Sequence, residues 1–123
     1  SIDPTLRKSR NNLAVVLLQT GRAAEAIPEA EMLTRVHPLF STGWHTLGLA
    51  RLQNGDLSEA DIAFGQAQDL SPLDADTAFR RGSVAWLQDH EEAAAGHWRR
   101  AIELDPGHAD ARRALEMART RVP

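Results

Sequence analysis

Four prolines stand at equal intervals along the chain, and this spacing constrains the fold more than any other feature of the sequence. They are Pro4, Pro38, Pro72 and Pro106, and each follows the previous one by 34 residues. A proline cannot continue a helix, and it biases the residue before it away from helical backbone. Its return at a fixed interval indicates one repeating structural unit, and such units fold as an array in which each buries its apolar surface against its neighbours.

Residues 34 positions apart also share size classes. Small residues let two helix backbones approach closely, and a large side chain from the partner helix can fill the space above them. We therefore expect the large members Phe64 and Trp98, together with Trp44, to lie in the core. The columns are Leu13, Leu47, Arg81 and Leu115; Ala14, Gly48 and Gly82; Ala26, Ala60 and Ala94; and Ala30, Phe64 and Trp98.

Each unit divides near its middle at a turn that contains Gly21, Gly55 or, in the third unit, Asp89. Glycine readily adopts the left-handed conformation that closes a helix, and apolar residues return at helical spacing on both sides of the turns. Each unit is therefore predicted to be two helices, and Pro28 is expected either to delay or to kink the helix that contains it. The predicted helices span residues 7–20, 23–36, 41–54, 57–70, 75–88, 91–104 and 108–121.

Residues 41–74 resemble a tetratricopeptide repeat. The neighbouring units match in part: residues 75–108 carry Ala78 and Arg81 where the signature has tryptophan and leucine, and residues 7–40 depart from it at Arg10 and Ala30. The residues of 41–74 that match the family signature are Trp44, Leu47, Gly48, Gly55, Ala60, Phe64, Ala67 and Pro72.

The resemblance implies an all-α fold, a right-handed α-solenoid of antiparallel helix pairs, with the first helix of each pair lining a concave face. We expect one domain over residues 1–123, made of units 7–40, 41–74 and 75–108 and a C-terminal capping helix over 108–121. The segment Ile2-Asp3-Pro4 repeats Leu104-Asp105-Pro106 in register. We therefore expect the chain to be a piece of a longer array.

Composition excludes several classes of function. The net charge of −3 argues against general binding to nucleic acid or to anionic membranes, which needs a concentrated basic surface. No apolar run approaches the length of a membrane span, and the absence of cysteine excludes disulfides and cysteine-bound metals. We expect a soluble protein of the cytoplasm or the periplasm. Arginine outnumbers lysine 13 to 1, which is typical of a G+C-rich bacterial coding sequence.

The sequence contains no arrangement of residues that predicts catalysis. The five histidines are scattered, and His90 and His97 lack the one-turn spacing of a helical zinc motif. No serine is flanked by the glycines of a nucleophile elbow, and no glycine-rich phosphate loop is present. We therefore expect no catalytic residue, no metal site and no cofactor, and we predict that the chain is not an enzyme.

Function is instead predicted on the concave face. Helical geometry places there the residues of the first helices that do not face their own partner helix. These give an apolar floor with polar walls, suited to an extended peptide or an amphipathic helix of a partner protein. The predicted groove residues are Asn11, Asn12, Val15, Leu18, His45, Thr46, Leu49, Leu52, Asp76, Phe79, Arg80, Ser83, Trp86 and Arg113.

Trp86 is the predicted anchor of this groove, because tryptophan offers a large contact area and one N–H donor. In the alternative, Phe79 and Trp86 pack against the last helix near Met117 and Arg113 and cover the end of the stack. Both interpretations remain open from the sequence.

Some tetratricopeptide domains bind the C-terminal carboxylate of a chaperone through a ring of lysine, asparagine and arginine. The matching positions here are Asn11, Val15, Thr46, Asp76 and Arg80, of which Arg80 alone keeps the expected charge and Asp76 reverses one. This disfavours a chaperone-tail adaptor.

The leading prediction is a non-catalytic scaffold that binds a segment of another protein. One alternative is self-association, in which arrays stack end to end or exchange a terminal helix, and an exposed Ile2 favours it. The other is a substrate-docking arm of a larger enzyme or secretion assembly.

Overall fold

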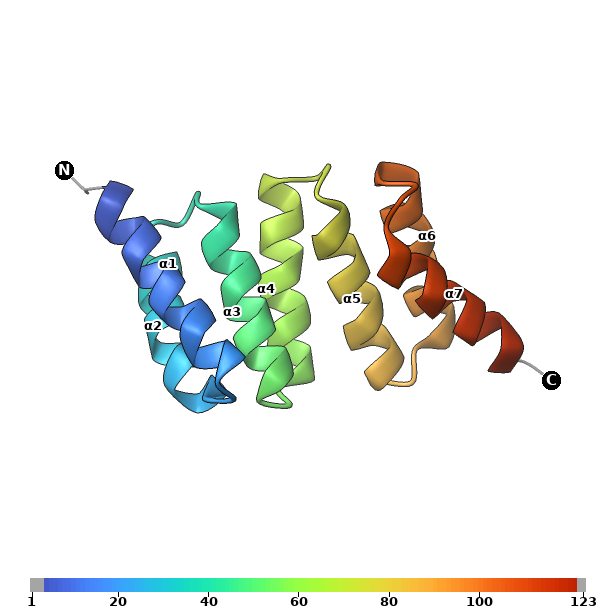
Figure 1. Cartoon of the computed structure of the whole chain (residues 1–123), viewed down its shortest axis with the longest axis horizontal. Helices are drawn as coiled ribbons and strands as arrows, with labels where there is room; N and C mark the ends of the chain where they lie inside the picture. Colours follow the sequence, from blue (N-terminus) through green and yellow to red (C-terminus); the bar gives the residue numbers. More distant parts are fainter. Residues whose placement is uncertain (1–3, 122–123) are drawn as a thin grey trace. The chain divides into compact units, whose positions relative to one another are not determined.

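The structure, a computed structural model, describes residues 4–121, and these residues form seven α-helices joined by short turns (Figure 1). Second helices begin and end where the sequence predicts, whereas first helices end one residue earlier and α1 begins three residues earlier. None of the described helices is both long enough and apolar enough to cross a membrane. The helices are α1 Pro4–Gln19, α2 Ala23–Val36, α3 Ser41–Gln53, α4 Leu57–Leu70, α5 Ala75–Leu87, α6 Glu91–Leu104 and α7 Ala109–Arg121.

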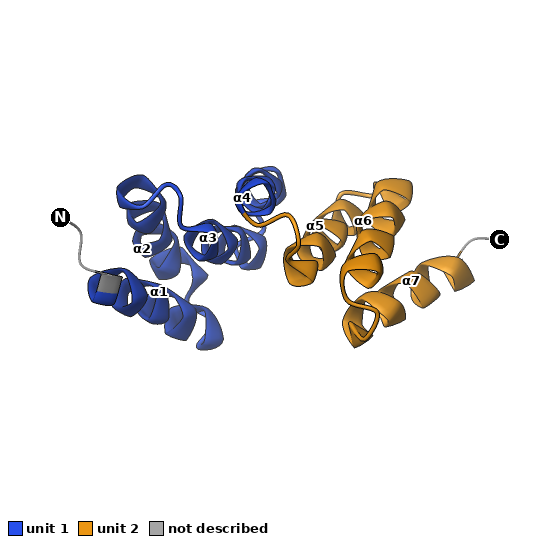
Figure 2. Ribbon diagram, turned by 90° about the horizontal axis from the view of Figure 1, so that it is seen from above, with its two compact units in different colours: residues 1–70 blue, residues 71–123 orange. Residues whose placement is uncertain are grey.

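The chain comprises two compact units (Figure 2). Unit 1, residues 1–70, contains the hairpins α1–α2 and α3–α4, and α2 also packs against α3. Unit 2, residues 71–123, contains the hairpin α5–α6 with α7 packed against α6. Each unit therefore buries its apolar residues between successive helices, as an array of helical hairpins requires.

The core of unit 1 follows the predicted alternation of small and large residues. Leu47 of α3 packs with Ala30 of α2 and Ala63 of α4, and Phe64 is fully buried. A β-carbon built on Gly48 would lie 2.6 Å from the Phe64 ring, so the glycine is what admits the ring. The prediction for Trp44 is wrong in part. This residue is half-buried beside the cluster, and its indole N–H donates to the Pro38 carbonyl over 2.8 Å.

The core of unit 2 is built around Trp98, which is buried as predicted. Its ring packs with Ala85 and Ala94, and its indole N–H donates to the Phe79 carbonyl over 3.2 Å. A second cluster joins all three helices of the unit through small residues, which allow close approach; they are Ala78 of α5, Ala101 of α6 and Ala111 of α7.

Pro28 and Leu13 differ in their surroundings from the average repeat. α2 begins at Ala23 and continues to Val36 with Pro28 inside it and exposed, so the proline does not delay the start of the helix. Leu13 shares its repeat position with Leu47, yet it is 47% exposed whereas Leu47 is 8% exposed. The difference arises because no described helix precedes α1 to cover Leu13 as α2 covers Leu47.

Candidate functional site

A cavity of about 530 Å³ opens between α5 and α7, and we call it the α5–α7 groove. It brings together four of the predicted groove residues, Phe79, Ser83, Trp86 and Arg113, and it also contains Met117. Sequence reasoning missed the others as lining residues, although Asp110, three residues before Arg113 on one helix face, could have been found from that spacing. The missed residues are Leu87, Trp98, Asp110 and Ala114.

The floor of the α5–α7 groove is aromatic. The Trp86 and Trp98 rings lie 5.6 Å apart between centroids and are inclined at 39°, and Phe79 packs against the same cluster. Leu87 and Met117 stand at the edge with about half of their surface exposed. Such a floor offers a desolvated apolar surface to a bulky side chain.

The polar groups of the α5–α7 groove already have partners inside unit 2. Ser83 Oγ donates to the Phe79 carbonyl over 3.3 Å, and this carbonyl also accepts from the indole of Trp98. At the rim, the Arg113 guanidinium pairs with the Asp110 carboxylate. The groove can therefore bind apolar side chains, and it holds none of the nucleophile–base pairs that acyl transfer requires.

Trp86 satisfies parts of both interpretations drawn from the sequence. It packs against Trp98, and from α7 the Arg121 guanidinium lies 5.0 Å from its ring centroid. It is nevertheless only half-buried, and it lines the α5–α7 groove. The packing alternative is thus correct for part of the side chain, and the role of anchor stays a prediction.

Asp76 and Arg80, predicted as polar walls, lie on α5 in an ion-pair network. Arg80 Nε is 3.6 Å from Asp76, and the guanidinium lies 5.5 Å from the Phe79 ring centroid. His108, which the sequence analysis did not assign to the site, holds this network to α7. Its Nε2 is 3.6 Å from Asp76, its ring is 5.1 Å from that of Phe79, and its Nδ1 accepts from the Ala111 N–H over 3.1 Å.

In unit 1 the structure brings two predicted residues into direct contact. Thr46 Oγ1 donates to Asn11 Oδ1 over 2.6 Å, and Thr46 is only 2% exposed. The assignment of Thr46 as an accessible polar wall is therefore wrong, because the close approach of α1 and α3 buries it. His45 packs edge-on against Phe64 of α4, with ring centroids 5.5 Å apart. Asn12 is exposed, as a polar wall should be.

The apolar groove residues predicted in unit 1 are all half-buried. Leu18 also accepts a hydrogen bond at its carbonyl from the Gln53 side chain over 3.0 Å, which ties the end of α1 to α3. These residues therefore lie at the helix packing seam and keep part of their surface open. They are Val15, Leu18, Leu49 and Leu52.

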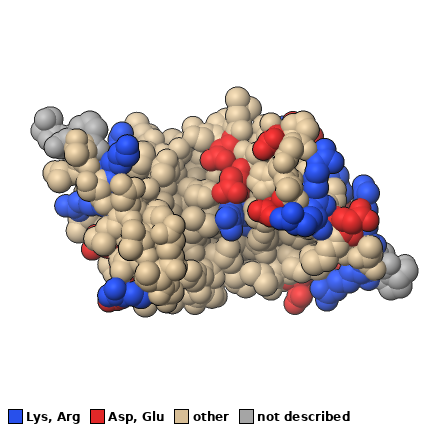
Figure 3. Space-filling view, in the orientation of Figure 1, with Lys and Arg blue, Asp and Glu red and all other residues tan. Residues whose placement is uncertain are grey.

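Charged side chains are unevenly distributed on the face seen in Figure 3. Acidic and basic groups alternate over unit 2, whereas most of the visible surface of unit 1 is uncharged. Among the described residues, no group of three or more histidine, aspartate or glutamate side chains is arranged to hold a metal ion.

A comparison with known protein families supports the repeat fold described above. The profile of the tetratricopeptide repeat family matches residues 45–109, which is more than half of the chain. The chain belongs to the tetratricopeptide repeat family. Its sequence is also 30% identical over 105 residues to the heat-shock protein cognate co-chaperone sgt12 of Aspergillus fumigatus. That match covers 85% of this chain and 31% of the co-chaperone, so the chain spans about a third of its curated relative.

Two solved structures show the same fold. The type III secretion chaperone SycD of Yersinia enterocolitica, in complex with a peptide of the translocator YopD, superposes with a TM-score of 0.89 at 16% identity, over 98% of this chain and 96% of that one. The first repeat domain of Spaghetti (RPAP3), bound to the HSP90 peptide SRMEEVD, gives a TM-score of 0.90 at 18% identity, over 97% and 94%. These likenesses confirm the all-α solenoid of antiparallel helix pairs.

Proposed function

We propose that the chain is a non-catalytic scaffold that holds a peptide or a helix of a partner protein in the α5–α7 groove. The observation that carries the proposal is the cavity itself, with three aromatic side chains, two exposed aliphatic side chains at its edge, and inner polar groups that are already hydrogen-bonded. The solved relatives support it, since SycD is described with a YopD peptide and RPAP3 with an HSP90 peptide.

The partner segment is expected to present bulky apolar side chains at helical or extended spacing. An open cavity of about 530 Å³ accepts several such side chains, and Trp86 offers the largest flat surface. Nucleic acid is not the expected ligand, because the lining is apolar and the chain is acidic overall.

The geometry argues against the acidic-tail mode that the RPAP3 peptide represents. Of the positions that match a carboxylate-binding ring, Thr46 is buried against Asn11, and Arg80 lies beside its own carboxylate partner Asp76. An acidic tail would have to displace Asp76 from Arg80 while it met the negative charge of Asp76 itself. We therefore propose an apolar segment rather than a chain-terminal carboxylate as the ligand.

The test uses the two methionines of the chain as a matched pair. Met117 lines the α5–α7 groove, whereas Met32 lies on α2, and they are similarly exposed at 47% and 41%. Twelve-residue peptides are selected by phage display on the immobilised chain, and their dissociation constants are measured by calorimetry. Met117→Glu should weaken the selected peptides at least tenfold, because it places a charge on the apolar lining, and Met32→Glu should leave them unchanged. Equal effects of the two substitutions, or selected peptides without bulky apolar residues, would overturn the proposal.

Self-association is a second candidate function because α1 carries exposed apolar residues. Leu6, Leu13 and Val16 are each about half exposed or more, and Ile2, which also entered this prediction, lies outside the described residues. In this candidate a second copy covers the α1 stripe. Sedimentation equilibrium at several concentrations should then show dimers that Leu13→Glu abolishes, while a monomer at all concentrations rules the candidate out.

A further inference from the structure

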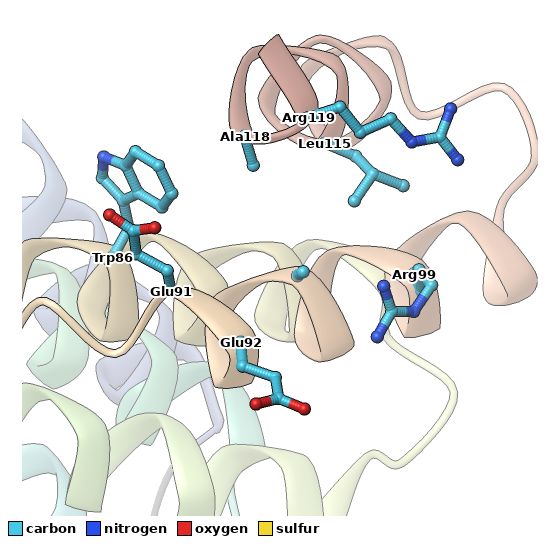
Figure 4. A pocket seen from close by; sticks show the side chains of 8 residues that line it. Trp86, Glu91, Glu92, Arg99, Leu115, Ala118 and Arg119 are labelled. Carbon is cyan, nitrogen blue, oxygen red and sulfur yellow. The ribbon is translucent and has the colours of Figure 1, made fainter. Parts of the chain in front are cut away.

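A second apolar surface lies between α6 and α7, and we call it the α6–α7 slot (Figure 4). Its cavity measures about 310 Å³. Figure 4 shows Glu91 beside Trp86 at one end, Arg99 and Arg119 towards the other, and Leu115 with Ala118 descending from α7. The lining residues are Trp86, Glu91, Glu92, Ala95, Arg99, Leu115, Ala118 and Arg119.

The repeat register shows what covers the corresponding surface in unit 1. Leu115 and Ala118 stand 68 residues after Leu47 and Ala50. Leu47 and Ala50 are buried, and Leu47 contacts Ala63 of α4, whereas Leu115 and Ala118 are only half-buried. The α6–α7 slot is therefore the counterpart of a surface that α4 covers, and no described helix follows α7 to cover it.

The charges of the two surfaces differ in an informative way. In unit 1, Arg51 of α3 contacts Glu31 of α2 at 2.6 Å and Asp56, just before α4, at 3.5 Å. The counterparts of Arg51 and Glu31 are Arg119 and Arg99, so an ion pair between neighbouring helices is replaced by two guanidinium groups that line one slot. Glu91 and Glu92 also line the slot and Arg119 lies 3.9 Å from Glu116 of its own helix, but the end that carries Arg99 and Arg119 is the one that favours a carboxylate, as Arg51 does with Asp56.

A second difference limits the shape of what can bind. Glu116 holds the register position of Gly48, above which the Phe64 ring of α4 packs closely. An aromatic residue at that point would meet a carboxylate side chain instead of open space. A small or basic side chain can lie there instead, because it leaves room for Glu116 or pairs with it.

We propose that the α6–α7 slot binds an amphipathic helix of a partner protein that resembles α4 except at one position. The helix begins with a carboxylate at the end of the slot that carries Arg99 and Arg119, lays alanine-sized residues on Leu115 and Ala118, and presents a basic or small residue to Glu116. The surface is separate from the α5–α7 groove, although Trp86 lines both. A scaffold with both surfaces could hold two segments at once.

The probe is a fluorescein-labelled peptide with the sequence of residues 56–70 of this chain and the change Phe64→Lys. Titrated into the 123-residue chain and followed by anisotropy, it should bind saturably. Arg99→Glu with Arg119→Glu in the protein, or Asp56→Lys in the peptide, should each weaken binding at least tenfold. Combining the two sets of changes should restore it, because the charges then complement each other again.

Met117→Glu serves as the control, because it changes the α5–α7 groove and leaves the α6–α7 slot intact. Binding that Met117→Glu weakens as much as the arginine changes do places the peptide in the α5–α7 groove and overturns the inference. So does the absence of saturable binding, or equal affinity for the peptide that keeps Phe64. Failure here leaves the selected peptides of the proposed function unaffected, so the two ideas are tested separately.

Discussion

The indole ring of Trp98 occupies the space that a side chain on Gly82 would need. A β-carbon on Gly82 would lie 2.4 Å from Trp98 Nε1 and 2.5 Å from Cδ1, which is well inside contact distance. Phe64 stands in the same relation to Gly48 in unit 1. In both hairpins, a glycine of the first helix thus admits an aromatic ring of the second, and the ring fixes how closely the helices approach.

Gly82→Ala is therefore expected to destabilise the chain by about 1–3 kcal/mol, because the buried indole must shift and its hydrogen bond to Phe79 is strained. Gly96→Ala is the matched control. Gly96 also lies within a helix, but a β-carbon there meets nothing within 4 Å, so helix propensity predicts stabilisation by about 0.5–1 kcal/mol. Urea unfolding monitored by circular dichroism measures both. Stabilisation by Gly82→Ala would contradict this account of the hairpin.

The fold could be predicted because the repeat sets several independent signals in one register. The prolines, the turn glycines and the small-residue columns all return at the same interval of 34 residues. Gly21 and Gly55 do adopt the positive φ that closes a helix. Asp89 takes the same conformation in the third turn, where the sequence offers no glycine, since the fixed length of the helices leaves the turn no alternative.

The candidate site could be predicted only in part, because exposure depends on what neighbours cover. The 34-residue repeat predicted that Phe79, Ser83, Trp86 and Arg113 share one surface, and in the structure they line one cavity. The same repeat could not predict that Thr46 is buried against Asn11, or that Leu13 stays exposed while Leu47 is buried. These outcomes depend on the particular helices on either side, whereas the repeat describes only an average unit.

The hydrogen bond from Thr46 to Asn11 links α1 to α3 within unit 1. Thr46→Val keeps the shape of the side chain and removes the donor, which leaves the half-buried Asn11 carbonyl without this partner. We expect a loss of about 1–2 kcal/mol in the free energy of unfolding. Asn11→Ala should cost a similar amount, and the double variant should cost less than the sum of the two. Strict additivity in the double-mutant cycle would show that the two side chains are not coupled.

His108 accepts a hydrogen bond at Nδ1 from the Ala111 N–H in the first turn of α7, which is the pattern of a helix N-cap. His108→Ala should therefore expose the first amides of α7 and cost about 1 kcal/mol, whereas His108→Asn, which can also cap, should cost less. Hydrogen exchange of the α7 amides provides the measurement. Equally faster exchange in His108→Ala and His108→Asn would mean that the packing of the ring on Phe79, rather than the cap, is what matters.

The Arg22 guanidinium donates hydrogen bonds to the Glu25 carboxylate at the start of α2, and these lower the pKa of Glu25 below its ordinary value. A carboxyl group with a lowered pKa in the folded state stabilises the fold above its unfolded pKa, and that contribution is lost as the pH falls through the folded pKa. Arg22→Gln should therefore raise the midpoint of the Glu25 carboxyl titration followed by NMR. A midpoint that does not move would show that the pair does not persist in solution.

Arg99→Glu offers a test of the register argument that does not depend on any ligand. The substitution recreates at positions 99 and 119 the pair that Glu31 and Arg51 form in unit 1. Both side chains are at the surface, so we expect a gain of only about 0.2–1 kcal/mol in the free energy of unfolding, and it should shrink in high salt.

Arg100→Glu, one residue along α6, is the control. It replaces the 3.6 Å ion pair with Glu103 by a repulsion and should not stabilise the chain. Two outcomes would contradict this argument: Arg99→Glu does not raise the free energy of unfolding, or the gain remains when Arg119→Ala is added. In either case positions 99 and 119 do not face each other across the α6–α7 slot as Glu31 and Arg51 do between α2 and α3.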